Sequence, residues 1–300
     1  MLPLLKPRYW LLWLGIGFLW SLTRLPHRWR LAAGRHIGHL GYRFAHRRRK
    51  IADINLKLCF PELNETQWQN LLQRHFESLG MGLLEMLAAW WLPDSTLKPL
   101  GDIEGLEHLH TALAEGKGVI LLGAHFTSIE IGTRFLTMHT AIHATYRQHE
   151  NPLIEHFMKT SRESHAEKAI PRHAVRDMLR SLKQNKPLWL AIDQNFGHKQ
   201  GVFAPFFGIA AATNTAASRL AHISKAKVVP FFTQRIADQG YKLTLQPALE
   251  NFPSGDNVQD ALRMNQLIEE QVRKAPEQYL WVHRRFKTRP VNEHININYR

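Results

Sequence analysis

A short apolar run, residues 119–122, is followed by a turn that contains His125, and Glu130 comes next in a stretch with helical spacing. The run has the length and composition of a buried strand, and residues 127–135 have the pattern of a helix. A strand followed directly by a helix is the unit of an open α/β sheet, where ligands bind at the carboxyl ends of the strands. We therefore expect His125 at that edge, facing a ligand site.

His125 and Glu130 are candidates for a catalytic pair. Residues five apart diverge by about 140° on one straight helix. The two side chains meet only if His125 precedes the helix and Glu130 points back from its first turns. Glu130 would then orient the imidazole and His125 would act as a general base. The alternative is a histidine that caps the turn beside an exposed glutamate, and the spacing alone does not decide between them.

The rest of the chain after Asp102 alternates between strand and helix patterns. Strands are predicted at 119–122, 143–146, 188–192, 227–232 and 241–246, and helices at 127–135, 152–164, 175–182, 213–224 and 258–274. This rhythm predicts an α/β fold with a mostly parallel central sheet flanked by helices. The sequence has no internal repeat and no low-complexity linker, which argues against a string of modules.

Two helical segments precede this region. Residues 27–60 have a basic helical pattern that ends at Pro61, and Asn64 can cap a following helix with Gln67 three residues later. An apolar stripe from Trp68 to Leu87 marks one face of that helix. We interpret the stripe as core, although its apolar end at residues 86–91 could also contact lipid.

The N-terminal 26 residues are predicted to be a membrane anchor. The uncharged stretch 9–22 would span about 21 Å as a helix, against about 30 Å of hydrocarbon. Arg8 and Arg24 could snorkel to make up the difference. A cleaved signal peptide is the rival interpretation, but no Ala-x-Ala site follows. The arginine-rich downstream side instead predicts an uncleaved anchor, spanning or interfacial, with residues 27–300 as a domain in the cytoplasm.

The charge balance favours an anionic partner. Lysines and arginines number 39 against 25 acidic residues, which gives a net charge of +14. Such a surface suits nucleic acid or an anionic membrane. Membrane is the better match because five of the nine tryptophans lie in strongly apolar stretches: Trp10, Trp13, Trp20, Trp90 and Trp91. The single Cys59 excludes an internal disulfide and indicates a reducing compartment.

The sequence lacks the motifs of several kinds of catalytic site. The 18 histidines include no His-Glu-x-x-His pattern, and the sequence has no Gly-x-Ser-x-Gly elbow and no phosphate-binding glycine loop. We therefore predict no metal, no acyl-serine and no cofactor. Arg147 and Arg162 follow the His125 unit and could bind phosphate at the same edge of the sheet. For either arginine alone, a solvated surface charge is the simpler interpretation.

Several blocks together resemble one protein family. They are His125-Phe-Thr-Ser-Ile-Glu130, the segments 7–10, 55–62, 77–82, 146–147 and 151–154, and the long C-terminal block 275–290. The chain resembles, over nearly its whole length, the late acyltransferases of lipid A biosynthesis, inner-membrane enzymes that add secondary acyl chains to a Kdo-bearing precursor. The wider His-x-x-x-x-Asp/Glu motif is shared with glycerolipid acyltransferases and alone identifies only the superfamily.

The resemblance implies roles for individual residues. His125 would be the general base and Glu130 its orienting partner, with Arg162 and Arg147 binding the substrate's phosphate side. One departure concerns the loop Asp193-Gln-Asn-Phe-Gly197, where members often carry Asp-x-Asp-x-Gly. Asn195 cannot serve as a second carboxylate, so only Asp193 is carried over as a substrate-binding residue. A second departure is Gln148, which stands where a proline is common.

The resemblance also implies a reaction and partners. A lauroyl or similar chain would pass from acyl-acyl-carrier-protein to a hydroxyl on an acyl chain of the anionic lipid A precursor, at the cytoplasmic side of a bacterial inner membrane. Two alternatives stay open: an acyltransferase acting on another phospholipid or glycolipid, and a non-catalytic basic membrane-binding protein. A nucleic-acid partner is not expected, because no nucleic-acid-binding motif is present.

Overall fold

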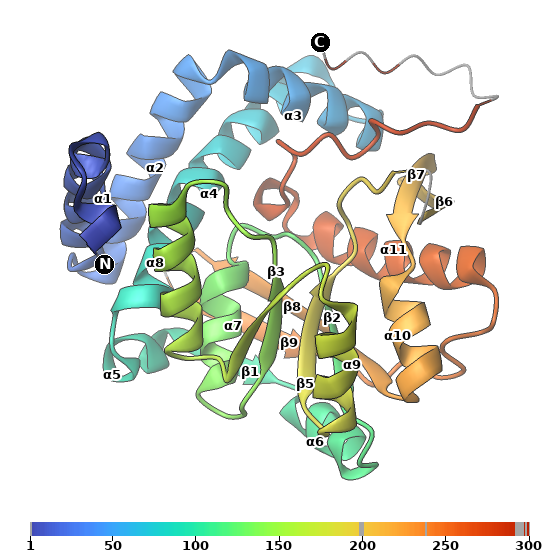
Figure 1. The fold of residues 1–300 in the computed structure, drawn as a ribbon. Coiled ribbons are helices and arrows are strands. Elements are labelled where there is room, and N and C mark those ends of the chain that lie inside the picture. The colour runs from blue at the N-terminus through green and yellow to red at the C-terminus, as the bar shows by residue number, and fades with distance from the viewer. Residues whose placement is uncertain (1, 198–200, 238, 292–296, 298, 300) are drawn as a thin grey trace.

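A seven-stranded sheet forms the centre of the computed structural model, which describes residues 2–197, 201–237, 239–291, 297 and 299 (Figure 1). The strand order is β1-β9-β8-β2-β5-β3-β4, and every neighbouring pair is parallel except β8 with β9. The mostly parallel α/β sheet predicted from the sequence is thus confirmed. The strands are β1 Gly101–Glu104, β2 Val119–Gly123, β3 His143–Tyr146, β4 Lys168–Pro171, β5 Pro187–Ala191, β8 Lys227–Ile236 and β9 Gly240–Leu245.

Helices cover both faces of this sheet. Alternate residues of β2 enter different clusters: Ile120 and Leu122 join one, while Val119 and Leu121 join the other. A strand buried on both faces reads as a continuous apolar run, which is why residues 119–122 were recognisable in the sequence. The helices of this region are α6 Leu106–Ala114, α7 Ile129–Thr137, α8 Pro152–Glu163, α9 Val175–Lys183, α10 Ala216–Ser224 and α11 Asn257–Lys274.

Four strands were not predicted from the sequence. Strands β1 and β4 are four-residue strands at the two edges of the sheet, too short for a clear apolar pattern. The other two, β6 Gly201–Phe206 and β7 Ile209–Asn214, form a separate antiparallel hairpin. The predicted helix 213–224 accordingly begins later, at Ala216.

The N-terminal layer consists of α1 Trp10–Thr23, α2 His27–Phe44, α3 His46–Cys59, α4 Glu65–Trp91 and the short α5 Asp94–Leu97. The predicted capping box is confirmed, since Asn64 accepts a hydrogen bond from the Gln67 backbone and the Gln67 side chain accepts one from Asn64. The core interpretation of the α4 stripe is also supported, because Leu72 and Phe76 are buried.

Helix α1 contains 14 residues. Among the described residues, none of the helices combines the length and the apolar character needed to cross a bilayer.

Two glycines of α4 allow close backbone contacts, one with α2 inside the N-terminal layer and one with the turn that carries His125. A Cβ at Gly80 would overlap the Gly34 carbonyl oxygen of α2, and a Cβ at Gly82 would lie 2.7 Å from the Thr127 carbonyl oxygen. Both contacts are closer than ordinary carbon–oxygen contact, so any larger residue must displace backbone. Because Thr127 lies in the turn that carries His125, Gly82 couples the position of α4 to the candidate site.

Candidate active site

His125 lies just beyond the carboxyl end of β2, between the neighbouring strands β8 and β5. This is the edge that the βα pattern predicted. Strand β2 is completely buried, whereas His125 is partly exposed. The turn after it is held by Ser128, whose hydroxyl donates a hydrogen bond to the Thr233 carbonyl oxygen of β8.

A buried carboxylate holds the His125 ring. Asp193 follows β5, and its Oδ1 lies 2.7 Å from His125 Nδ1, while its Oδ2 accepts the His125 backbone N–H at 2.9 Å. The Asp193 residue is 2% exposed. Two hydrogen bonds to one residue fix both the backbone and the ring, so Nδ1 carries the proton and Nε2 is the basic nitrogen. Nε2 has no hydrogen-bond partner among the described residues.

His125 and Asp193 shift each other's pKa values. Burial acts to lower the pKa of His125, but the Asp193 carboxylate more than compensates, so the net pKa is raised from 6.5. Burial acts to raise the pKa of Asp193, but the His125 ring and its hydrogen bonds lower that pKa to about 2. Asp193 is therefore ionised at neutral pH and stabilises a positive charge on the imidazole.

Glu130 occupies a different place from the one predicted. Its carboxylate makes no hydrogen bond to the His125 ring and instead pairs with Arg162 of α8, and Arg162 Nε donates to Oε1 at 3.1 Å. The Trp90 indole N–H also donates to Glu130, at 3.2 Å. The expected histidine–glutamate contact is thus replaced by histidine–aspartate. Asp193, expected to bind substrate, has both oxygens occupied by His125.

The arginines predicted to bind phosphate differ in exposure. Arg162 is largely buried, and its guanidinium lies 5.6 Å from the centroid of the Tyr146 ring. One of its nitrogens, Nη1, is buried without a hydrogen-bond partner among the described residues. Arg147 is 68% exposed and lies 3.6 Å from Glu150. Arg162 is therefore a fixed donor, whereas Arg147 is a solvated cation at the rim.

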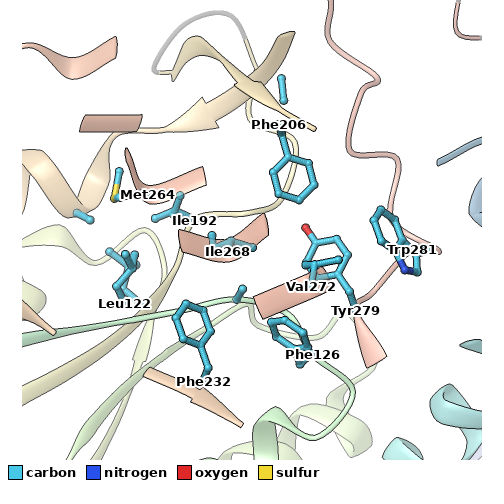
Figure 2. Close-up of a cluster of buried hydrophobic side chains, with 14 of the residues drawn as sticks. Leu122, Phe126, Ile192, Phe206, Phe232, Met264, Ile268, Val272, Tyr279 and Trp281 are labelled. Atoms are coloured by element: carbon cyan, nitrogen blue, oxygen red, sulfur yellow. The ribbon is translucent and has the colours of Figure 1, made fainter. Parts of the chain in front are cut away.

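The C-terminal segment 278–283, which we call the strap, pairs with the turn that carries His125. The Leu280 N–H donates to the His125 carbonyl oxygen at 3.0 Å, and the Thr127 N–H donates to the Gln278 carbonyl oxygen at 2.8 Å. Figure 2 shows Tyr279 of the strap against Phe126 of the turn, with ring centroids 5.7 Å apart. The strap thus fixes the backbone on both sides of Phe126.

The strap also contacts the loop that carries Asp193. His283 Nε2 accepts the Asn195 backbone N–H at 2.9 Å. Burial lowers the pKa of His283 to about 4, so the ring is neutral and can accept this bond. The Asn195 side chain donates to Thr288 Oγ1 at 3.0 Å. Residue-type patterns did not predict these contacts; the only sequence signal was the resemblance of the block 275–290.

Two hollows meet at His125. The inner cavity, of about 250 Å³, is mostly apolar and lies between α4, α7 and α8. The basic groove, of about 790 Å³, opens on the other side toward α9 and α10. Residues of the inner cavity include Trp90, Ile129, Glu130, Thr133, Met158 and Arg162, and those of the basic groove include Arg147, Arg172, Val175, Arg219 and Ile223.

The site is equipped for proton transfer from a hydroxyl group. A neutral imidazole held by a buried carboxylate is the usual form of a general base, and Arg162, which can donate to an oxygen, lines the same cavity as His125. The described residues contain no cluster of three or more histidine, cysteine or acidic side chains that could hold a metal ion. The arginines around the site are suited to anionic groups.

Comparisons with known proteins point to one family. Residues 2–288 match the model of the family described as bacterial lipid A biosynthesis acyltransferase. The chain is 40% identical to the lipid A biosynthesis palmitoleoyltransferase of Escherichia coli K12 over 96% of this chain and 95% of that protein. It is 40% identical to the lauroyltransferase of the same organism, over 96% and 94%. Identity to the myristoyltransferase is 27%, over 96% and 90%.

Proposed function

Because this chain belongs to the bacterial lipid A biosynthesis acyltransferase family and is a lipid A acyltransferase, we propose that it transfers a fatty acyl chain from a carrier-protein thioester to a hydroxyl of the lipid A precursor, with His125 as the base. The observation that carries the proposal is the hydrogen bond between Asp193 and His125 Nδ1, which leaves Nε2 available at the meeting point of two hollows. The acyl chain is of the lauroyl or palmitoleoyl class that the relatives' names describe.

The reaction proceeds by direct acyl transfer. His125 Nε2 takes the proton of the acceptor hydroxyl, and the oxygen attacks the thioester carbonyl carbon. The carbon–sulfur bond breaks, and the sulfur leaves with the proton that the imidazolium returns. A new ester and a free carrier thiol result, so no other reactant is needed.

Asp193 and Arg162 act on different charges of this reaction. The Asp193 carboxylate stabilises the imidazolium that forms on His125, because its own pKa is about 2 and it stays ionised. Arg162 Nη1 binds the oxygen on which negative charge develops at the thioester carbonyl. Glu130 holds Arg162 in place through its paired oxygens. In this assignment Glu130 is a positioning residue of the arginine and not of the histidine.

The two hollows receive different parts of the substrates. The inner cavity is mostly apolar and accommodates an acyl chain. It lies on the side of α1, because Trp13 of α1 packs against Phe157 of α8 with ring centroids 5.3 Å apart. Arg147 lies on the wall of both hollows and, as an exposed cation, binds a phosphate of the acceptor.

Residues 1–26 attach the catalytic domain, residues 27–300, to the cytoplasmic surface of the bacterial inner membrane. Helix α1 exposes Leu11, Leu14 and Phe18 to 82%, 71% and 63%. Exposed apolar residues next to Arg8 and Arg24 are typical of a helix that lies in the membrane interface. Trp29 and Phe44 of α2 are further exposed apolar residues of the N-terminal layer.

The test is transfer of labelled chains from a panel of acyl-carrier-protein thioesters to the Kdo-bearing lipid A precursor in detergent. Wild-type protein is expected to form the acylated product, and His125→Ala to lose about 10²- to 10⁴-fold in rate. Binding of the precursor by the variant is the control for its folding. Near-full activity of His125→Ala would contradict the mechanism. If another phospholipid were acylated in preference to the precursor, that phospholipid would replace the precursor as the proposed acceptor.

A further inference from the structure

The outer wall of the basic groove is positively charged. Arg172 precedes α9, and Arg219 lies on α10; both line the groove and both are exposed. Neither has an ion-pair partner among the described residues, and no aspartate or glutamate lines the groove. A hollow with cations and no carboxylate attracts an anionic occupant.

The charge continues outside the groove along two helices that pack together. Arg176 of α9 and Lys225 at the end of α10 are exposed, and neither has an ion-pair partner among the described residues. Arg219, His222 and Ile223 share one face of α10, since they are spaced by three and four residues. The positive charge therefore extends beyond the residues that line the groove.

Apolar side chains lie within this positive surface. Val175 is 51% exposed and Ile223 is 63% exposed, and both line the groove. Beyond residue 44, only two other described large apolar residues are exposed, Val258 and Val291. Exposed apolar residues ringed by charge are typical of a protein-binding surface and not of a site for a phosphosugar alone.

The position of these helices separates them from the lipid-facing side. Figure 1 shows α1 at the opposite side of the molecule from α10, with the sheet and α8 between them. If α1 lies in the membrane interface, α9 and α10 face water. A partner at this surface is then a soluble protein and not a lipid.

We propose that the α9/α10 face, formed by Arg172, Arg176, Arg219 and Lys225 around Val175 and Ile223, is the docking surface for the acidic carrier protein that brings the acyl thioester. The inference rests on the proposed function, since it takes the donor to be a carrier-protein thioester. The carrier binds at the outer end of the basic groove, and its prosthetic arm reaches His125 through the groove. The acceptor approaches from the side of α1.

The experiment compares the double variant Arg176→Glu/Lys225→Glu with the wild type. Neither residue lines the groove, so the reacting groups stay in place. The matched control is Lys98→Glu/Lys159→Glu, which makes the same change of net charge at exposed positions after α5 and on α8, on the other side of the molecule from α10 (Figure 1). KM and kcat are measured for an acyl-carrier-protein thioester, for a neutral acyl-pantetheine thioester and for the lipid acceptor, and carrier binding is measured directly by calorimetry.

The docking proposal predicts that the KM for the carrier thioester and the Kd for the carrier rise about tenfold or more in the double variant. The KM values for acyl-pantetheine and for the lipid acceptor stay at those of the wild type and of the control. A rise in KM confined to the lipid acceptor, or no difference between the double variant and the control, would overturn the docking proposal. If the wild type transfers from no donor, the proposed function fails, and the calorimetry still decides whether the carrier binds this face.

Discussion

Two glutamate–arginine pairs lie near the turn that carries His125, and their surroundings differ. Glu85 of α4 pairs with Arg235 of β8, with side chains 1% and 4% exposed. Glu130 of α7 pairs with Arg162 of α8, with both side chains 19% exposed. Each pair is a glutamate with an arginine, and each joins two helices or a helix and a strand. Residue types alone therefore do not distinguish the two pairs.

The two glutamate–arginine pairs differ in their hydrogen bonds. Arg235 also donates to Ser78 and Thr127, and the Tyr241 hydroxyl donates to Glu85, so the buried pair is bonded entirely within the fold. Arg162 keeps Nη1 without a partner among the described residues, and Arg162 is one of the residues that line the cavity that His125 shares. A satisfied pair stabilises the fold, whereas an unsatisfied donor beside a cavity is available to a substrate.

The first way to test the comparison is Glu85→Gln. The substitution leaves the Arg235 charge buried without a counter-ion, and we expect the free energy of unfolding to fall by about 3–5 kcal/mol. Urea unfolding followed by circular dichroism measures the change. The control is Glu104→Gln, which removes an exposed pair with Lys242 and should leave the unfolding midpoint unchanged. Equal effects of the two substitutions would contradict the structural role of the buried pair.

The second test is Glu130→Gln, which removes the partner of Arg162. We expect kcat to fall about 10²-fold, because the donor to the developing oxyanion loses its fixed position. The free energy of unfolding should fall by about 1 kcal/mol or less, since the pair borders a cavity. Lys159→Gln, an exposed change on the same helix α8, is the control and should alter neither quantity. A loss of stability as large as that of Glu85→Gln would erase the distinction between the pairs.

The third test is Gly82→Ala, which pushes α4 away from the turn that Glu85 and Arg235 support. The new Cβ would lie 2.7 Å from the Thr127 carbonyl oxygen, and we expect a loss of about 1–3 kcal/mol in unfolding free energy. Activity should fall with it, because the same turn carries His125. Gly17→Ala in α1 is the control, since its Cβ meets nothing within 4 Å. A fully active and fully stable Gly82→Ala protein would contradict the close contact.

The fold was largely predictable from the sequence because its signals are local. The buried run 119–122 and the alternation after it identify the sheet, and the pattern Asn64 to Gln67 identifies the start of α4. The edge strands β1 and β4 were not predicted, because each has only four residues. Length and burial are what make an element recognisable from the sequence alone.

The candidate site was less predictable because its contacts are distant in the sequence. His125 and Asp193 are 68 residues apart and meet because β2 and β5 are neighbours in the sheet. The spacing of His125 and Glu130 indicated a closer partner, but Glu130 is drawn to Arg162, 32 residues away. Strand order, which residue types do not encode locally, decides which carboxylate holds the histidine.

The central claim is that Asp193, and not Glu130, holds the catalytic histidine, and the pH dependence of kcat/KM tests it most directly. Asp193 raises the pKa of His125 above 6.5, and only the neutral ring is a base, so wild-type kcat/KM should rise with pH through that raised pKa. In Asp193→Asn the carboxylate that raises the pKa of His125 is gone, and burial lowers that pKa. The acidic limb of the kcat/KM profile should therefore shift to lower pH, and its plateau should fall. In Glu130→Gln the limb should stay at the wild-type pH. A limb that moves in Glu130→Gln and stays in Asp193→Asn would contradict the account.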